Sequence, residues 1–285
     1  MRSRRALGTV ALLIAAGGML VACTDDDPDG SEGPRSAESS SAAAESTAPT
    51  PTPAARPPRT PKVGACYRMA FDAALAPTSG ARPRDCAEPH TAETYRVGSL
   101  DTLADGHLLA VDSDRAQQQV AEACPGRLSS YVGGDLTDLR LSMVRPVWFT
   151  PTVAASDKGA NWFRCDAVVV TGSAGLFRTT GSLRGILDGA RSDEVAMCGT
   201  AAPDAAAFDR VPCAARHSWR AISVVTFVAR DYPGAAAARE RGQGTCEDAA
   251  EALADDPLDF EWGYEWPTKA QWGNGMTFGR CWAPD

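Results

Sequence analysis

Eight cysteines after residue 62 constrain this 285-residue chain more than any other feature, because they fall into two sets of four. The first set is Cys66, Cys86, Cys124 and Cys165, with spacings of 20, 38 and 41 residues, and the second is Cys198, Cys213, Cys246 and Cys281, with spacings of 15, 33 and 35. The second set is a slightly compressed copy of the first, which indicates an internal repeat. The chain is therefore expected to fold as two related units.

The sequence around the cysteines supports the same register. A histidine stands four positions after the second cysteine of each set, at His90 and at His217. A Pro-Thr pair, a glycine and an arginine precede the last cysteine at matching distances; they are Pro151, Thr152, Gly159 and Arg164 in the first unit and Pro267, Thr268, Gly275 and Arg280 in the second. We therefore predict a tandem duplication, with one domain over residues 63–190 and another over 191–285.

Each unit has the pattern of an α+β fold. Runs rich in apolar and β-branched residues follow the two histidines, at 94–100 and at 221–228, and predict strands. Between the units, residues 172–193 carry several large apolar side chains among glycines and arginines. This stretch is too apolar for a loose linker, so we expect it to pack on the first unit as a strand or turn.

A helix is expected in each unit around the third cysteine. In the first unit it should cover 115–123, with Asp112 or Ser113 as its N-cap. In the second unit the Ala-rich stretch 234–253 is expected to be helical, but Gly242 and Gly244 within it should split the helix, because glycine weakens helices.

Disulfides are expected rather than a metal site. An even number of cysteines in an exported chain is typical of a disulfide framework. A cysteine and a histidine four residues apart could ligate zinc, but thiols outside the cell normally pair, and the two Cys/His pairs lie far apart in the sequence. If each unit folds alone, three pairings per unit remain open. We favour the pairing that closes neighbouring loops in both units, namely Cys66 with Cys86, Cys124 with Cys165, Cys198 with Cys213, and Cys246 with Cys281.

The N-terminus has the layout of an export signal. Three arginines precede an uncharged stretch that ends in Leu20-Val21-Ala22-Cys23. This ending resembles the bacterial lipobox, which implies a signal peptide over 1–22, cleavage before Cys23 and lipid attachment to its thiol. The alternatives are an ordinary cleaved signal with a chance cysteine, or an uncleaved helical anchor. The lipoprotein interpretation places the chain on the extracytoplasmic face of the membrane.

The segment after the signal has the composition of a tether. Residues 24–62 contain no Leu, Ile, Val, Met, Phe, Tyr or Trp and end in a Pro-rich run. Such a segment buries too little apolar surface to fold, and as a flexible coil it would span about 35 Å. We expect a disordered tether over 23–62 that lifts the folded part off the membrane.

Charge narrows the range of partners. The chain carries a formal net charge of −8, and removal of the arginine-bearing signal makes the mature chain more acidic still. Nucleic-acid binding relies on basic side chains that neutralise phosphates, so we expect no nucleic-acid partner. The motifs of phosphate-binding loops, zinc proteases and serine hydrolases are also missing from the sequence. We expect no cofactor.

The arrangement resembles the septum formation family of actinobacterial envelope proteins. The matching features are an opening Gly-x-Cys at Gly64, a Cys-x-x-Pro-His-x-x-Glu motif from Cys86 to Glu93, and a Pro-Thr to Cys close in both units. In the second unit Arg216 and Arg220 replace the proline and the glutamate of that motif. The resemblance implies two tandem septum-formation domains and a link to cell division.

The motif histidines are the first candidate binding residues. His90 with Glu93 is the only arrangement in which a nearby carboxylate could orient an imidazole for general-base catalysis. His217 is the counterpart of His90 in the second unit. The alternative is that both histidines satisfy backbone groups in a turn that follows a disulfide.

Aromatic residues near the end of the chain form the second candidate set. Trp262, Trp266 and Trp272 lie among turn residues and acids. Such a cluster can stack on sugar rings or anchor a protein partner. Filling the core of a small disulfide-bonded domain is the alternative role.

Together these features predict a membrane-anchored, non-enzymatic binding module of the cell envelope. Its partner would be a cell-wall glycan or a division or envelope protein. The alternatives are an envelope hydrolase that uses His90 and Glu93, and a passive structural surface protein.

Overall fold

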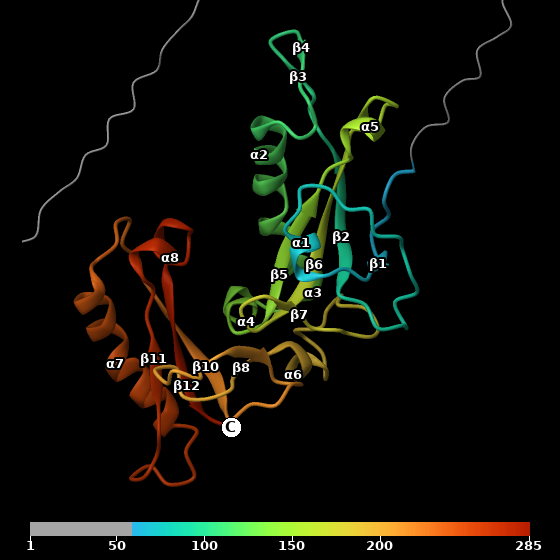
Figure 1. Ribbon diagram of the computed structural model, residues 1–285. Coiled ribbons are helices and arrows are strands. Elements are labelled where there is room, and N and C mark those ends of the chain that lie inside the picture. Colours follow the sequence, from blue (N-terminus) through green and yellow to red (C-terminus); the bar gives the residue numbers. More distant parts are fainter. Residues whose placement is uncertain (1–58) are drawn as a thin grey trace, which may run out of the picture. The chain divides into compact units, whose positions relative to one another are not determined.

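The computed structural model describes residues 59–285 (Figure 1). The predicted signal peptide 1–22, the predicted lipid-bearing Cys23 and nearly all of the predicted tether 23–62 lie outside the described residues. Within 59–285, no helix combines the length and apolar character needed to cross a membrane.

The described part is a mixed α+β fold with two main sheets. The first half contains β1 (Cys66–Tyr67), α1 (Phe71–Ala74), β2 (Ala92–Ser99), β3 (Leu103–Ala104), β4 (His107–Leu108), α2 (Asp114–Ala123), the 3-10 helix η1 (Pro125–Arg127), α3 (Leu128–Val132), α4 (Leu136–Arg140), β5 (Val144–Phe149), α5 (Val153–Ser156), β6 (Trp162–Thr171), β7 (Gly175–Leu176) and α6 (Ser192–Val195). The second half contains β8 (Met197–Gly199), β9 (Arg210–Pro212), β10 (Trp219–Thr226), α7 (Ala235–Glu251), β11 (Gly263–Glu265), α8 (Lys269–Gly273) and β12 (Phe278–Pro284).

The two sheets share one strand order. In the first half the order is β1-β2-β6-β5, with β7 paired to the end of β6, and in the second half it is β8-β10-β12-β11, with β9 outside β8. All of these pairs are antiparallel. The register between the two central strands is shifted at the same place in both halves, between Thr94 and Arg96 and between Ala221 and Ser223. The equal order and equal irregularity support the proposal that the halves arose by duplication.

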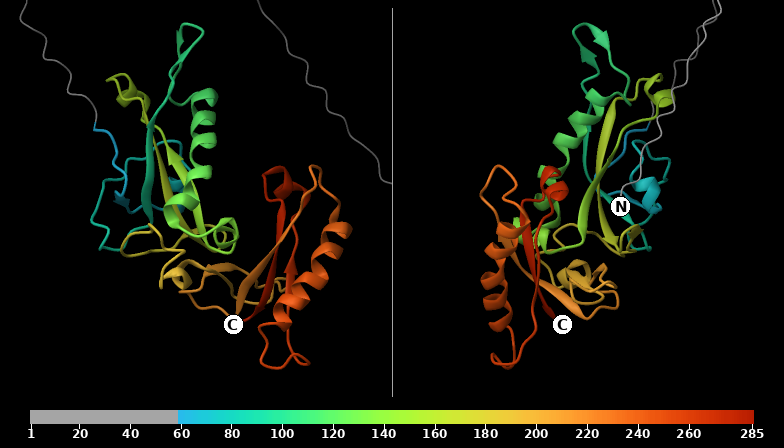
Figure 2. Two further views of the ribbon diagram at one scale, coloured as in Figure 1. Left: turned by 180° about the vertical axis from the view of Figure 1, so that it is seen from behind. Right: turned by 60° about the vertical axis from the view of Figure 1, so that its left-hand side comes forward.

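Successive side chains of β6, an inner strand of the first sheet, point to opposite faces of the sheet. Cys165, Ala167 and Val169 pack with residues of α2 and α3 on one face, whereas Val168 packs with Tyr67 on the other. This is the period of two that places successive strand residues on opposite faces. Figure 2 shows α2 along one side of this sheet in both views.

Four disulfides lie in the described part, and two of them join the main helix of a half, α2 or α7, to an inner strand of its sheet, β6 or β12. The pairs are Cys66–Cys86, Cys124–Cys165, Cys198–Cys213 and Cys246–Cys281, the four pairs expected from the sequence. Cys124 at the end of α2 reaches β6, and Cys246 in α7 reaches β12.

The helix of the first half is capped by Ser113, one of the two candidates from the sequence. Its side-chain oxygen accepts a hydrogen bond from the amide of Ala116, which satisfies one of the free donors at the helix start.

In the second half the predicted break in the helix is wrong, because α7 continues through both of its internal glycines. At Gly242 a Cβ atom would lie 2.0 Å from the ring of Tyr264, so only glycine lets that ring reach the helix backbone. The local cost of glycine in a helix, about 1 kcal/mol, is outweighed by this packing.

The largest core cluster contains residues of both halves. Val120, Leu128 and Met143 come from the first half, whereas Met197 and Trp282 come from the second. Residues on both sides of the predicted boundary at 190 are thus buried together. The stretch expected to pack on the first half does so, because Leu183 and Ile186 belong to the same cluster.

We expect the disulfides to contribute unequally to stability. Cys124–Cys165 closes a separation of 41 residues and Cys198–Cys213 one of 15. Because the restriction of the unfolded chain grows with the logarithm of loop length, replacing the first pair with alanines should cost about 1 kcal/mol more than replacing the second, on a base of about 3 kcal/mol. Urea unfolding of the two double variants measures the difference. An equal or reversed cost would contradict this account, and peptide mapping without reductant provides the control on pairing.

Candidate functional site

His90 is fully buried and its polar atoms bind nearby groups of the protein. Its backbone exchanges two hydrogen bonds with Thr179, with N to O distances of 3.0 and 2.9 Å. The ring Nδ1 lies 3.0 Å from the carbonyl oxygen of Glu88, and Nε2 lies 3.4 Å from the hydroxyl of Thr179. Because a carbonyl oxygen only accepts, Nδ1 must donate its hydrogen to Glu88.

Glu93 is equally buried, and three donors converge on its carboxylate. The hydroxyl groups of Tyr131 and Ser182 each donate to Oε1 at 2.7 Å, and the amide of Leu183 donates to Oε2. Burial, followed by the bond to Glu93, raises the pKa of Tyr131 to about 12, so the phenol keeps its proton and donates it. All three contacts therefore use the carboxylate as an acceptor.

These two side chains hold the connector, which we define as residues 172–191, against the first half. Thr179, Ser182 and Leu183 are all connector residues, and each is bound by His90 or Glu93. The Cys-x-x-Pro-His-x-x-Glu motif thus organises contacts with a segment about 90 residues further along the chain.

His90 and Glu93 are buried and do not contact each other through a hydrogen bond. His90 is 0% exposed and Glu93 is 2% exposed, and within 59–285 no hydrogen bond joins them. A general base must reach the proton that it removes. Neither side chain reaches solvent in this conformation.

His217 occupies a similar turn in the second half, but its Nε2 contacts a carboxylate, whereas Nε2 of His90 contacts a hydroxyl group. Its Nδ1 lies 2.7 Å from the carbonyl of Ala215, and its Nε2 lies 2.9 Å from Oδ2 of Asp285. Arg220 donates to the same oxygen at 3.1 Å and to Asp193 at 2.9 Å. Burial raises the pKa of Asp285, but the hydrogen bonds from His217 and Arg220 outweigh it and leave that pKa below its usual value.

Arg220 stands in the strand position that Glu93 holds in the first half. Glu93 lies opposite Cys66 in the β1–β2 pair, and Arg220 lies opposite Cys198 in the β8–β10 pair. The exchange of a carboxylate for a guanidinium replaces a buried set of hydrogen bonds with a half-exposed ion-pair group. The second half therefore does not repeat the arrangement around Glu93.

Two groups of side chains within 59–285 have the spacing of metal ligands. One comprises Cys66, Cys86 and Glu93, and the other comprises Cys198, His217 and Asp285. Each cysteine in these groups is part of a disulfide. A disulfide sulfur has no thiolate to offer, so neither group provides a Cys-based zinc site.

The three candidate tryptophans lie together around the disulfide Cys246–Cys281. Trp272 is 8% exposed, and Trp262 and Trp266 are partly buried against the same apolar cluster. The indole of Trp272 packs edge-on against Phe227 with ring centres 5.6 Å apart, and its Nε1 donates to the carbonyl of Arg230 at 3.2 Å. These rings fill the layer between the second sheet and α7.

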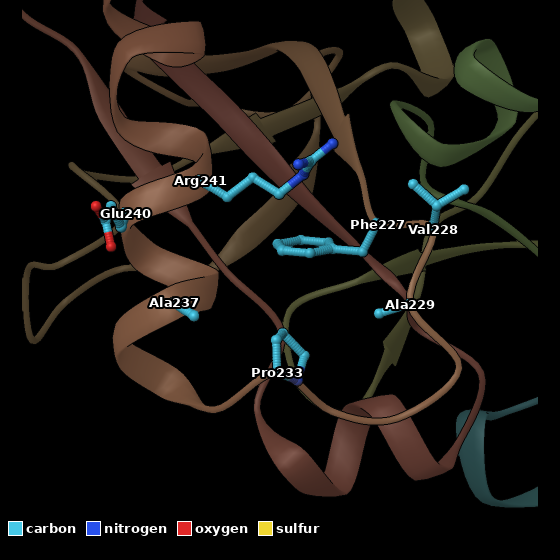
Figure 3. Close-up of a pocket in the computed structure, with 7 residues that line it drawn as sticks. All are labelled: Phe227, Val228, Ala229, Pro233, Ala237, Glu240 and Arg241. Carbon is cyan, nitrogen blue, oxygen red and sulfur yellow. The ribbon is translucent and has the colours of Figure 1, made fainter.

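An open hollow of about 620 Å³ lies beside this cluster, at the end of β10 and the start of α7. Phe227 forms one wall, and Arg241 reaches over its ring at 5.9 Å from the centroid (Figure 3). Val228 at its edge is 92% exposed. No motif in the sequence indicated this hollow.

A buried ion pair lies on the central strand of the first sheet. The guanidinium of Arg164 lies between the rings of Tyr67 and Phe149, at 3.8 and 4.7 Å, and its Nε is 3.3 Å from Asp166. Thr94 donates to the other oxygen of Asp166 at 2.7 Å. Burial raises the pKa of Asp166 to about 6, although Arg164 and Thr94 both act to lower it.

A family model described as septum formation matches residues 63–281, which include the motif and both sheets. The chain belongs to the septum formation family. One match covers both halves, so it does not separate them into two copies of the family's region. The septum formation family is not a known enzyme family. No curated protein and no solved structure matches the chain.

In this member of the septum formation family, sequence reasoning missed the residues that complete the motif. Thr179, Ser182 and Tyr131 bind His90 and Glu93 but are ordinary polar residues far away in the sequence. The one available indication was the apolar character of residues 172–193, which predicted that this stretch packs on the first half. It did not show which of its polar residues face the motif.

We expect Glu93→Gln to lower the free energy of unfolding by about 2–4 kcal/mol, because an amide nitrogen would face donors that now bind a buried carboxylate. Urea unfolding measures this loss. Glu122→Gln is the matched control, since Glu122 is exposed on α2 and its side chain accepts a hydrogen bond from Gln118; its cost should stay below about 0.5 kcal/mol. Equal costs for the two variants would contradict the role assigned to Glu93.

Asp166 should make the protein more stable as the pH falls towards 4. Its pKa of about 6 in the fold exceeds the ordinary value of 3.8, so between these values the folded state binds more protons than the unfolded state. The contribution is lost as the pH rises through 6, and amounts to at most about 3 kcal/mol. The carboxyl carbon of Asp166 should titrate near pH 6 by NMR, and Asp166→Asn should remove that step. A midpoint below 4.5 would refute the assignment.

Proposed function

We propose that this chain is an extracytoplasmic lipoprotein, anchored through Cys23, whose folded part binds a protein partner in the cell envelope at the division septum without catalysis. Membership of the septum formation family supports the link to the septum. Four disulfides support an oxidising compartment, because such bonds persist mainly outside the cytoplasm.

The observation that carries the non-enzymatic proposal is the burial of the motif. The only His–Glu pair that the sequence offered for catalysis is occupied in holding the connector, as the contacts of His90 and Glu93 show. Their side chains support the shape of the molecule, which a binding protein needs as much as an enzyme does. The alternatives are an envelope hydrolase that uses these two residues and a passive structural protein.

A protein partner is favoured over a wall glycan. Stacking on sugar requires exposed aromatic faces, whereas Trp272 is 8% exposed and Trp262 and Trp266 pack against the core cluster around Cys246–Cys281. The ring of Trp266 is further covered by Arg239, 5.5 Å from its centroid. Crosslinking in living cells followed by mass spectrometry identifies the neighbour. Recovery of glycan fragments alone would contradict this choice.

Cys23→Ala should abolish lipid attachment and release the protein from the membrane fraction. The thiol of Cys23 is the attachment point, and each buried methylene of the lipid contributes about 0.8 kcal/mol to anchoring. Incorporation of labelled palmitate and fractionation measure both effects. Ser36→Ala, in the same segment, should keep the label and the location. An unlabelled wild-type protein in the membrane fraction would refute the lipoprotein proposal.

The enzyme alternative predicts a different result. If His90 were a general base, the wild-type protein would release soluble fragments from isolated cell walls and His90→Ala would not, with the same fold by circular dichroism. We expect wild type and His90→Ala to release equal, background amounts. A loss of turnover with the fold intact would overturn the non-enzymatic proposal.

A further inference from the structure

A pocket of about 280 Å³ is lined by three arginines from three strands. Arg145 comes from β5 in the first half, and Arg210 and Arg280 come from β9 and β12 in the second. Arg280 is 5% exposed, and the other two are partly buried. None of these residues belongs to the motif or to the tryptophan cluster.

Acidic partners do not balance these charges. Glu265 forms an ion pair with Arg210 and lies 3.8 Å from Nη1 of Arg280, so one carboxylate serves two guanidinium groups. Glu265 is not itself part of the lining, whose one acid, Asp209, is exposed. Three guanidinium groups therefore face one lining carboxylate and one neighbouring carboxylate, so the pocket carries an excess of positive charge.

Arg145 and Arg280 also donate to neutral carbonyl groups. Arg145 binds the backbone oxygens of Ser142 and Val144 at 3.0 and 2.6 Å. Nε of Arg280 binds the backbone oxygen of Arg140 at 3.0 Å. These carbonyls orient the side chains but do not neutralise them.

The electrostatic effect of this crowding is large. Burial, followed by the charges of Arg145, Arg210 and Arg140, lowers the pKa of Arg280 to about 9. Burial and the charge of Arg210 lower the pKa of Arg145 to about 10. Both side chains remain protonated and positively charged at neutral pH. Their mutual repulsion therefore persists unless an anion binds between them.

Comparison with the first half shows what is missing. Arg164 and Arg280 each precede the cysteine of the central strand, and Asp166, two positions after Arg164, pairs with it inside the first sheet. The corresponding residue in the second half is Trp282, which is buried in the shared core. Arg280 therefore lacks the carboxylate that its counterpart has on the same strand.

We propose that this pocket binds the phosphate group of a small ligand. Guanidinium groups bind phosphate oxygens through paired hydrogen bonds, and three arginines from different strands suit a tetrahedral group with several oxygens better than a flat carboxylate. The volume exceeds that of one phosphate, which leaves room for an attached group. The proposal does not depend on the anchoring or septum proposals, so its failure would leave both of them untouched.

The test measures binding of inorganic phosphate to the full chain, with its disulfides formed, by titration calorimetry at low salt and pH 7. We expect saturable binding of one phosphate per chain and at least tenfold weaker binding of acetate. Glycerol phosphate serves as the second probe. Binding tighter than phosphate indicates a phosphoryl group on a larger molecule, and equal binding indicates the free ion; either result supports a phosphate site. No saturable binding of phosphate, or equal binding of acetate, would overturn the proposal.

Variants separate the pocket from general charge effects. Ser173 lies exposed at the pocket, and Ser173→Asp places a carboxylate where it competes with the ligand without removing a buried arginine. Asparagine has the shape of aspartate without its charge. Ser173→Asp should therefore bind phosphate at least tenfold more weakly than Ser173→Asn does. Arg145→Gln should also lose at least tenfold, whereas Arg115→Gln, an exposed change on α2, should bind as the wild type does. Equal affinities for the two Ser173 variants would refute the site.

Discussion

The disulfide between the main helix and the central strand is the bond on which each half depends. The bond Cys124–Cys165 holds the end of α2 against β6, and the bond Cys246–Cys281 holds α7 against β12. Once the helix is fixed there, the alternate side chains of the strand are divided between the helix layer and the opposite face. In the first half that opposite face buries Arg164 and Asp166, and in the second it turns Arg280 towards the arginine pocket.

The connector contributes more than a link between two repeats. Glu93 binds its middle, and Arg220, at the equivalent strand position, binds Asp193 just beyond its end. The ion pair to Asp193 is weak, since that carboxylate is 77% exposed, whereas the contacts of Glu93 are buried. The two halves are thus unequal at this strand position: one holds the connector, and the other presents an ion-pair group near the surface.

Cysteine spacing and local motifs predicted a large part of this fold. They indicated the four disulfides, the α+β class, the strands after each histidine and the packing of the connector, because these features depend on spacing or on local composition. The role of Gly242 was not predictable, since it depends on Tyr264 from a later strand. The role of Glu93 was hidden for the same reason, because its partners lie far along the chain. Arg145, Arg210 and Arg280 carry no common motif, and only the meeting of three strands groups them.

The shared core has a consequence for the order in which the molecule is assembled. Trp282 lies on β12, an inner strand of the second sheet, and it belongs to the same buried core cluster as Leu128 and Met143 of the first half. A chain that emerges N-terminus first, from a ribosome or a translocation pore, cannot complete the interior of its first half until that strand has arrived. We therefore expect the earlier half to keep part of its core open until then, while its cysteines can still meet oxidants and wrong partners. Correct pairing is thus a matter of timing as well as of geometry.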